Sequence, residues 1–174
     1  MTPPNGWAEI EALYGHPAKA DGNLDAAWFR TNIVLVEPPD GWVLRYQQDA
    51  ATLFPTTGVR MHRLVADAWL AAMHAEWLYA QAQAPADPLA WLQSLRLDQH
   101  GGGFNFRPQR DSTKLSMHAF GCAWDRDPIH NPRRQPLTCT IPGWCFNIWH
   151  GFGWTDGRHF ATPDPMHFQF ASGA

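Results

Sequence analysis

Apolar residues recur every three or four positions over residues 58–84, which is the clearest periodic feature of the chain. This spacing is typical of an amphipathic helix with one apolar face, and we expect Pro85 to end it. Asp87 and Pro88 then supply an N-cap and a first-turn proline for a short second helix. His62 and His74 fall within the predicted long helix, where we interpret them as surface or packing residues.

The remaining patterns favour strands. Residues 33–36 and 42–46 are rich in β-branched and aromatic side chains and flank a Pro/Asp/Gly turn, which predicts a hairpin or two neighbouring strands. Beyond residue 103 the helical periodicity is lost, and short strands are expected at 121–125, 144–149 and 166–170. A helical part followed by a strand-rich part predicts an α+β fold, with a small antiparallel sheet packed against the long helix.

Composition narrows the class of protein. A chain of 174 residues suits a single compact domain, residues 1–174. Thirteen Lys and Arg against 16 Asp and Glu leave no basic excess for binding nucleic acid. No apolar run approaches the length needed for membrane insertion, and the first residues lack signal-peptide features, so we expect a cytoplasmic, monomeric protein. Three cysteines without a C-x-x-C pair are expected to be reduced, and the ten tryptophans to be core residues first.

The densest polar cluster runs from Ser116 to Asp125. His118 and Asp125 offer an imidazole and a carboxylate, and zinc accepts both as ligands. Gly121 between them permits a tight turn, after which a strand could return Asp125 to the same centre as His118.

A third candidate ligand, His167, follows Asp164 by three residues. Residues three apart in a regular strand point to opposite faces, but Pro163 and Pro165 argue against a regular strand, and a bend could aim both side chains into one site. Two histidines and one carboxylate leave one position on zinc open, as in catalytic sites. A free carboxylate nearby would accept a proton from water. Spacing alone does not separate this arrangement from a chance one.

The run Ser116-x-His118-x-x-Gly121-x-Ala123-x-Asp125 resembles, position for position, the S-x-H-x-x-G-x-A-x-D motif of the zinc D-alanyl-D-alanine carboxypeptidase family of peptidoglycan peptidases. The pair Asp164-x-x-His167 is similar to the second motif of this family, in which a general base precedes the last zinc ligand. The resemblance is dense over residues 102–170, which we take as the motif-bearing part.

Further similarities indicate the phage-endolysin branch of L-alanyl-D-glutamate endopeptidases. They are Arg107 before the serine motif, Asp127-Pro128, Asn131-Pro132, and Phe152-Gly153-Trp154 before the last motif. This branch also tends to use Asp as the base, as this chain would with Asp164.

The resemblance implies that His118, Asp125 and His167 bind one Zn²⁺ ion and that Asp164 is the general base. Arg107 would hold a substrate carboxylate or polarise the scissile carbonyl, which suits the planar donor fork of arginine. Arg110 is the alternative for this role.

Two further positions are interpreted from the resemblance. Ser116 would orient the site or touch substrate, or serve only as a turn residue. The family commonly has Glu two residues after the last histidine, where this chain has Gln169. In a strand Gln169 shares a face with His167, so its amide could still accept a hydrogen bond from that ligand. His130, His150 and His159 match no ligand position.

The function that the resemblance implies is zinc-dependent hydrolysis of an amide bond in peptidoglycan stem peptides, between L-Ala and D-Glu. One alternative is a D,D-carboxypeptidase or D,D-dipeptidase with the same zinc chemistry. Another is a non-catalytic, zinc-containing module that binds wall peptide. Because the wall lies outside the membrane, we expect a protein without a signal peptide to act after release, as in phage or prophage lysis.

Overall fold

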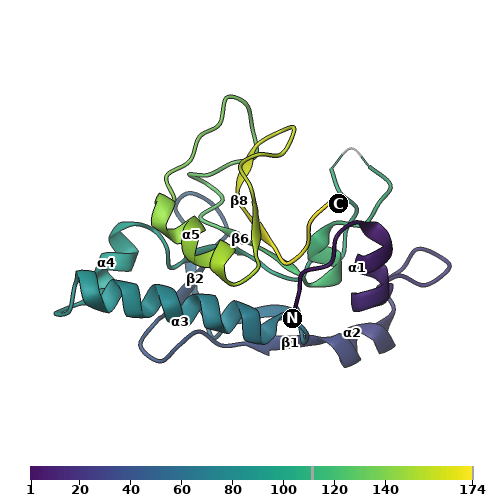
Figure 1. Cartoon of the computed structure of the whole chain (residues 1–174), viewed down its shortest axis with the longest axis horizontal. Coiled ribbons are helices and arrows are strands. Elements are labelled where there is room, and N and C mark those ends of the chain that lie inside the picture. The colour runs from purple at the N-terminus through teal and green to yellow at the C-terminus, as the bar shows by residue number, and fades with distance from the viewer. Residues whose placement is uncertain (111, 174) are drawn as a thin grey trace.

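The computed structural model describes residues 1–110 and 112–173 and has the predicted α+β architecture (Figure 1). The helices are α1 (Trp7–Tyr14), α2 (Ala26–Asn32), α3 (Ala66–Gln83), α4 (Pro88–Ser94) and α5 (Gly143–Gly151), with a 3-10 helix, η1 (Met117–Phe120). The strands are β1 (Ile33–Val36), β2 (Leu44–Gln47), β3 (Leu53–Thr56), β4 (Val59–His62), β5 (Gln99–Gly102), β6 (Ala123–Arg126), β7 (Thr155–Gly157) and β8 (Asp164–Gln169).

The strands form two sheets. Six of them are ordered β3-β2-β5-β6-β8-β7, while β1 and β4 form a separate antiparallel pair. The larger sheet is mixed, because β2 and β5 are parallel and its other neighbours are antiparallel. The strands β6 and β8 are neighbours within this sheet, and their register sets Asp125 opposite His167. This pairing places residues 42 positions apart in sequence at one point.

The expected hairpin of residues 33–36 and 42–46 is wrong. β1 pairs with β4, and β2 pairs with β3 and β5, so the segment between β1 and β2 crosses from one sheet to the other. Gly58 lets β4 approach β1, because a Cβ there would lie 2.3 Å from the carbonyl oxygen of Val36. The turn residues were recognised correctly, but strand partners are chosen by contacts distant in sequence.

The long helix begins later than predicted. Residues 59–62 form β4, where buried Val59 and Met61 flank exposed Arg60 with the two-residue period of a strand. His62 therefore ends a strand and is buried, whereas His74 lies exposed on α3. The short helix α4 is confirmed, since the carboxylate of Asp87 accepts a hydrogen bond from the Ala90 amide at 2.9 Å.

In the second half of the chain, the predicted strand at 144–149 is wrong. That segment lies in α5, whose buried residues Cys145, Phe146 and Trp149 have the spacing of one helix face. The predicted strands at 121–125 and 166–170 correspond to β6 and β8. Despite its flanking prolines, Asp164 begins β8, and the register of β7 against β8 shifts between Asp156 and Gly157.

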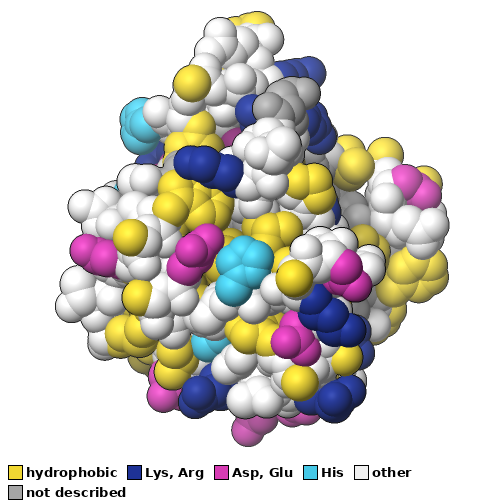
Figure 2. Space-filling model, turned by 90° about the vertical axis from the view of Figure 1, so that its right-hand side faces the viewer, with side chains coloured by type: hydrophobic (Ala, Val, Ile, Leu, Met, Phe, Trp, Pro, Cys, Tyr) yellow, Lys and Arg dark blue, Asp and Glu magenta, His cyan; other side chains and the backbone are white. Residues whose placement is uncertain are grey.

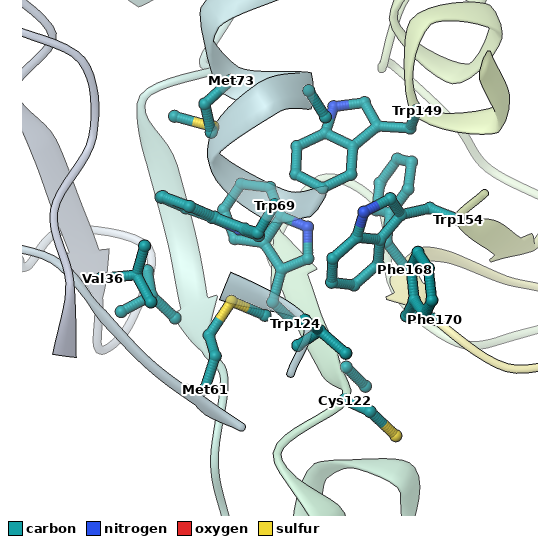
Figure 3. Close-up of a cluster of buried hydrophobic side chains, with 14 of the residues drawn as sticks. Val36, Met61, Trp69, Met73, Cys122, Trp124, Trp149, Trp154, Phe168 and Phe170 are labelled. Atoms are coloured by element: carbon teal, nitrogen blue, oxygen red, sulfur yellow. The ribbon is translucent and has the colours of Figure 1, made fainter. Parts of the chain in front are cut away.

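Tryptophans fill the core between the larger sheet and helices α3 and α5 (Figure 3). Trp124 of β6 lies with its ring centroid 5.5 Å from that of Trp69 and 5.0 Å from that of Trp149. Trp154 packs on Trp149 at 5.2 Å. All four are fully buried, which confirms their interpretation as core residues. These rings support the face of β6 opposite Asp125.

A buried ion pair lies within this core, behind β6. Arg126 donates to both carboxylate oxygens of Glu76 on α3, at 2.5 and 2.8 Å. The indole nitrogen of Trp149 also donates to Glu76, at 2.9 Å. Although burial disfavours a charged guanidinium, the Glu76 carboxylate raises the pKa of Arg126 above its usual value. The pair joins the sheet to the helical layer.

The surface carries no dominant charge on the face shown in Figure 2, where cationic, anionic and apolar side chains are interspersed. The three cysteines are free thiols. Among the residues described, no helix is both long enough and apolar enough to span a bilayer.

Candidate active site and metal centre

Three side chains from three elements converge beside the sheet. His118 comes from η1, Asp125 from β6 and His167 from β8. The Nε2 atom of His118 and the Nδ1 atom of His167 lie 3.2 and 3.1 Å from Oδ1 of Asp125, and 3.2 Å from each other. These three residues could hold a metal ion.

The short helix η1 aims His118 because both of its ends are fixed. The hydroxyl of Ser116 caps its start and accepts from the His118 amide at 3.3 Å. Gly121 ends it in the left-handed region, at φ 70°. A Cβ on Gly121 would lie 2.7 Å from the backbone nitrogen of His62, so only glycine fits there. The spacing of the serine motif thus has a local structural cause.

The outer nitrogen of each imidazole is held by a carbonyl group. His118 Nδ1 lies 2.6 Å from the carbonyl oxygen of Gly103, and His167 Nε2 lies 3.0 Å from Oε1 of Gln169. The Gln169 amide nitrogen donates to the carbonyl of Ala171 at 3.2 Å, which orients its oxygen toward His167. Carbonyl oxygens only accept, so each outer nitrogen carries the proton. The inner nitrogens then present lone pairs to each other and to Asp125.

This donor set fits a zinc ion. Tetrahedral zinc with bonds of about 2.0–2.1 Å would separate neighbouring ligand atoms by roughly 3.3 Å, close to the 3.1–3.2 Å separations found here. Two imidazole lone pairs facing a carboxylate also need a shared cation or proton between them. Partners on the outer nitrogens are typical of metal-binding histidines.

The electrostatics of the three side chains show the same demand for positive charge. Burial alone would raise the pKa of Asp125, but His118 and His167 beside it hold that pKa well below its usual range. Burial alone would lower the pKa of His167, but hydrogen bonding to Asp125 and the charge of that carboxylate raise it. Because a metal ion and protons compete for the same ligand atoms, metal binding at this centre is expected to depend on pH.

Asp164 lies in the same cavity, which is about 320 Å³ in volume and is also lined by the three convergent side chains. Its Oδ1 atom is buried without a hydrogen-bond partner among the described residues. Burial raises the pKa of this carboxyl group. The Asp164 carboxyl group thus lines the cavity, but it does not belong to the cluster of ligand atoms.

Both candidate arginines line this cavity. Arg107 and Arg110 are exposed there, and Arg107 also lines an adjoining cavity of about 260 Å³ beside Tyr46 and the glycine run 101–103. Ser116 contributes to the wall of the first cavity as well as capping η1. The cavity does not discriminate between the two arginines.

Sequence reasoning missed Arg133, which lines the first cavity. The available signal was its position next to the Asn131-Pro132 similarity, but its approach to Asp164 depends on contacts between two loops. Two of the three unassigned histidines are engaged elsewhere: His130 pairs with Asp127, and His150 with Asp156, each at 2.7 Å.

Comparison with known proteins bears on this site. Residues 110–170 match the family model described as D-alanyl-D-alanine carboxypeptidase. The family resemblance is confirmed over this segment. No curated protein and no solved structure matches the chain. The segment matching the carboxypeptidase family contains the three convergent residues and Asp164, but it excludes Arg107 and Gly103. Similarity to this family over residues 110–170 supports a metallopeptidase with a peptidoglycan-related substrate.

Proposed function

We propose that the protein is a zinc-dependent, endolysin-like peptidase that hydrolyses the L-Ala–D-Glu amide bond of peptidoglycan stem peptides. The observation that carries this proposal is the convergence of two imidazole lone pairs and one carboxylate, with the separate Asp164 carboxylate in the same cavity. The choice of bond rests on the sequence similarities to the endolysin branch. Action on the wall would follow release of the protein during lysis.

Zinc held by His118, Asp125 and His167 would supply Lewis acidity that polarises the scissile carbonyl and acidifies water. Asp164 takes the proton of the attacking water as its oxygen bonds to the carbonyl carbon. The same carboxyl group then gives that proton to the departing nitrogen as the C–N bond breaks. Arg107 or Arg110 donates hydrogen bonds to the carbonyl oxygen as negative charge develops on it.

The orienting contacts serve this chemistry before substrate arrives. The Gly103 carbonyl and the Gln169 amide oxygen fix both imidazoles with their inner lone pairs exposed. Gln169 thus fulfils through its amide oxygen the contact expected of it, and the amide is compatible with metal binding.

The first experiment combines metal content with product analysis. Purified protein should contain one zinc ion per chain, and it should clarify a peptidoglycan suspension until a chelator is added, with recovery on zinc addition. Mass spectrometry should detect fragments with a new amino group on D-Glu. Release of free D-Ala would instead identify a D,D-carboxypeptidase.

Matched histidine variants make the test specific. His118→Ala should lose both zinc and hydrolysis, whereas His74→Ala, which alters an exposed histidine on α3, should retain both. Zinc retained by His118→Ala would overturn the ligand assignment. Zinc bound without hydrolysis of any wall preparation would contradict the enzymatic role and indicate a binding module.

A further inference from the structure

Arg133 is a partly buried arginine in the wall of the catalytic cavity, and the mechanism above does not use it. Across residues 1–110 and 112–173, no ion pair joins its guanidinium group to a carboxylate. Its charge does act on Asp164, where it lowers the pKa against the larger, opposite effect of burial. A cationic side chain held beside the proposed base without an ionic partner is available to a ligand.

Two loops hold Arg133 in this position. The backbone amide of Arg134 donates to the carbonyl of Pro163 at 3.0 Å, directly before Asp164. The Gln135 side-chain amide donates to the carbonyl of Ala161 at 2.7 Å. The loop that follows β6 is therefore tied to the loop that precedes β8, so the place of Arg133 beside Asp164 is set by backbone contacts.

The base of the Arg133 loop is also fixed. The buried Asn131 side chain accepts from the Thr140 amide at 2.6 Å and donates to the carbonyl of Asp127 at 3.0 Å. Both ends of the loop are thereby joined through one side chain. A pre-positioned arginine loses little conformational freedom when it binds a ligand.

The position of Arg133 relates it to the proposed proton donor. Arg107 lines both adjoining cavities, which share residues of the metal centre, whereas Arg133 lines the cavity that contains Asp164 and is absent from the described lining of the other. Asp164 would deliver its proton to the departing nitrogen. Since the charge of Arg133 acts on Asp164, Arg133 lies near the group that would protonate the residue leaving with the new amino group.

The charge of the cavity favours an anionic ligand. Among the described residues, its walls hold three guanidinium groups, from Arg107, Arg110 and Arg133, and the two carboxylates of Asp125 and Asp164. This cationic excess contrasts with the net charge of −3 of the whole chain. Clefts lined by one sign of charge attract ligands of the opposite sign.

We propose that Arg133 is a specificity-determining residue that binds a free carboxylate on the residue supplying the leaving amine. This inference rests on the proposed function, and it defines the substrate as a peptide with a carboxylate beside the scissile nitrogen. A D-Glu residue with an unmodified α-carboxylate presents that group, and so does a chain-terminal D-Ala. Conversion of the carboxylate to a carboxamide removes the ionic partner of Arg133.

The test uses synthetic stem peptides in matched acid and carboxamide forms, one pair for the L-Ala–D-Glu bond and one for a terminal D-Ala–D-Ala bond. The preferred bond identifies the source of the carboxylate. Wild-type protein should favour the acid form by about 10- to 100-fold in kcat/KM, as expected for a charge-assisted hydrogen bond. Arg133→Gln should abolish this preference and Arg133→Lys should keep part of it, while Arg134→Gln should retain it in full.

Binding is measured in parallel on metal-free protein by calorimetric titration with the acid and carboxamide forms of the product that carries the new amino group. The acid form should bind more tightly, and only the Arg133 variants should lose the difference. An acid preference that survives in Arg133→Gln, or no preference in wild-type protein, would overturn the inference. Acid-selective binding through Arg133 without hydrolysis by wild-type protein would support the inference while refuting the proposed peptidase function.

Discussion

Asp125 and Arg126 are adjacent in sequence but belong to two different polar centres on opposite faces of β6. Asp125 faces a cavity and meets two histidines, whereas Arg126 faces α3 and meets Glu76 within the tryptophan core. The first centre brings three ligand atoms within 3.2 Å of one another beside a cavity. The second centre is closed, because both carboxylate oxygens of Glu76 accept hydrogen bonds from the Arg126 guanidinium group. Polar groups near a sheet thus indicate chemistry when they are left open, and stability when they are paired.

The largest expected effect is a loss of hydrolysis without a loss of stability, at the cavity that Asp125 faces. Asp164→Asn should reduce the rate of hydrolysis by about 10²- to 10⁴-fold, since the amide cannot take a proton from water. Zinc content and the unfolding midpoint should change little, because Asp164 is outside the ligand cluster. Kinetic assays with metal analysis test this, with exposed Asp40→Asn as the control. Near-normal turnover by Asp164→Asn would exclude it as the base.

A substitution in the buried pair of Glu76 and Arg126 should instead reduce stability. Glu76→Gln leaves Arg126 buried without a countercharge and should lower the free energy of unfolding by about 3–5 kcal/mol. Urea denaturation measures the loss, and Glu37→Gln, at an exposed position, is the matched control. A loss no larger than that of the control would show that the pair is energetically unimportant.

Acid should distinguish two kinds of buried histidine. Burial lowers the pKa of His62 and His100 from 6.5 to about 4, in contrast to His167 beside its carboxylate. The unfolded chain therefore binds more protons than the native state between pH 6.5 and 4. Stability from both residues is complete above pH 6.5 and declines as the pH falls through this window.

The loss should amount to about 2 kcal/mol for each of these two histidines between pH 7 and pH 5. Urea denaturation of the metal-free protein at both pH values measures it, so that zinc release does not contribute. A free energy of unfolding that stays constant across this range would contradict the neutral, buried state of His62 and His100.

The smallest expected effect concerns the hydrogen bond between Gln169 and the metal-ligand candidate His167. Gln169→Ala removes the acceptor on His167 Nε2 and should weaken zinc binding by about 10- to 100-fold, with little change in fold stability. Competition with a chromogenic chelator measures the affinity. Gln169→Glu should restore it, because a carboxylate accepts the same hydrogen bond. Equal zinc affinity in all three proteins would show that the contact is incidental.

Much of the candidate site could be predicted because its residues are fixed by local structure. Ser116 begins η1 and Gly121 ends it through contacts within a few residues, so the motif can be recognised in the sequence. Strand partners were harder, since β1 and β4 are joined by contacts across two intervening strands. The strand prediction for residues 144–149 was wrong because aromatic residues favour strands as well as buried helix faces.

The closed centre and Arg133 could not be predicted for a related reason. Glu76 and Arg126 are 50 residues apart and carry no motif. Arg133 approaches Asp164 only because backbone and side-chain amides tie two loops together. Such contacts are products of the folded chain and leave no periodic trace in the sequence.

The carbonyl of Gly103 has a consequence for protein engineering. It orients His118 from outside the segment that matches the carboxypeptidase family, and a side chain at Gly103 would lie 2.4 Å from the carbonyl oxygen of Arg60. Residues 110–170 therefore do not contain every contact that the site needs. A chimera with a related peptidase would have to transfer β5 and Gly103 together with residues 110–170, and would need the glutamate of α3 to accommodate Arg126.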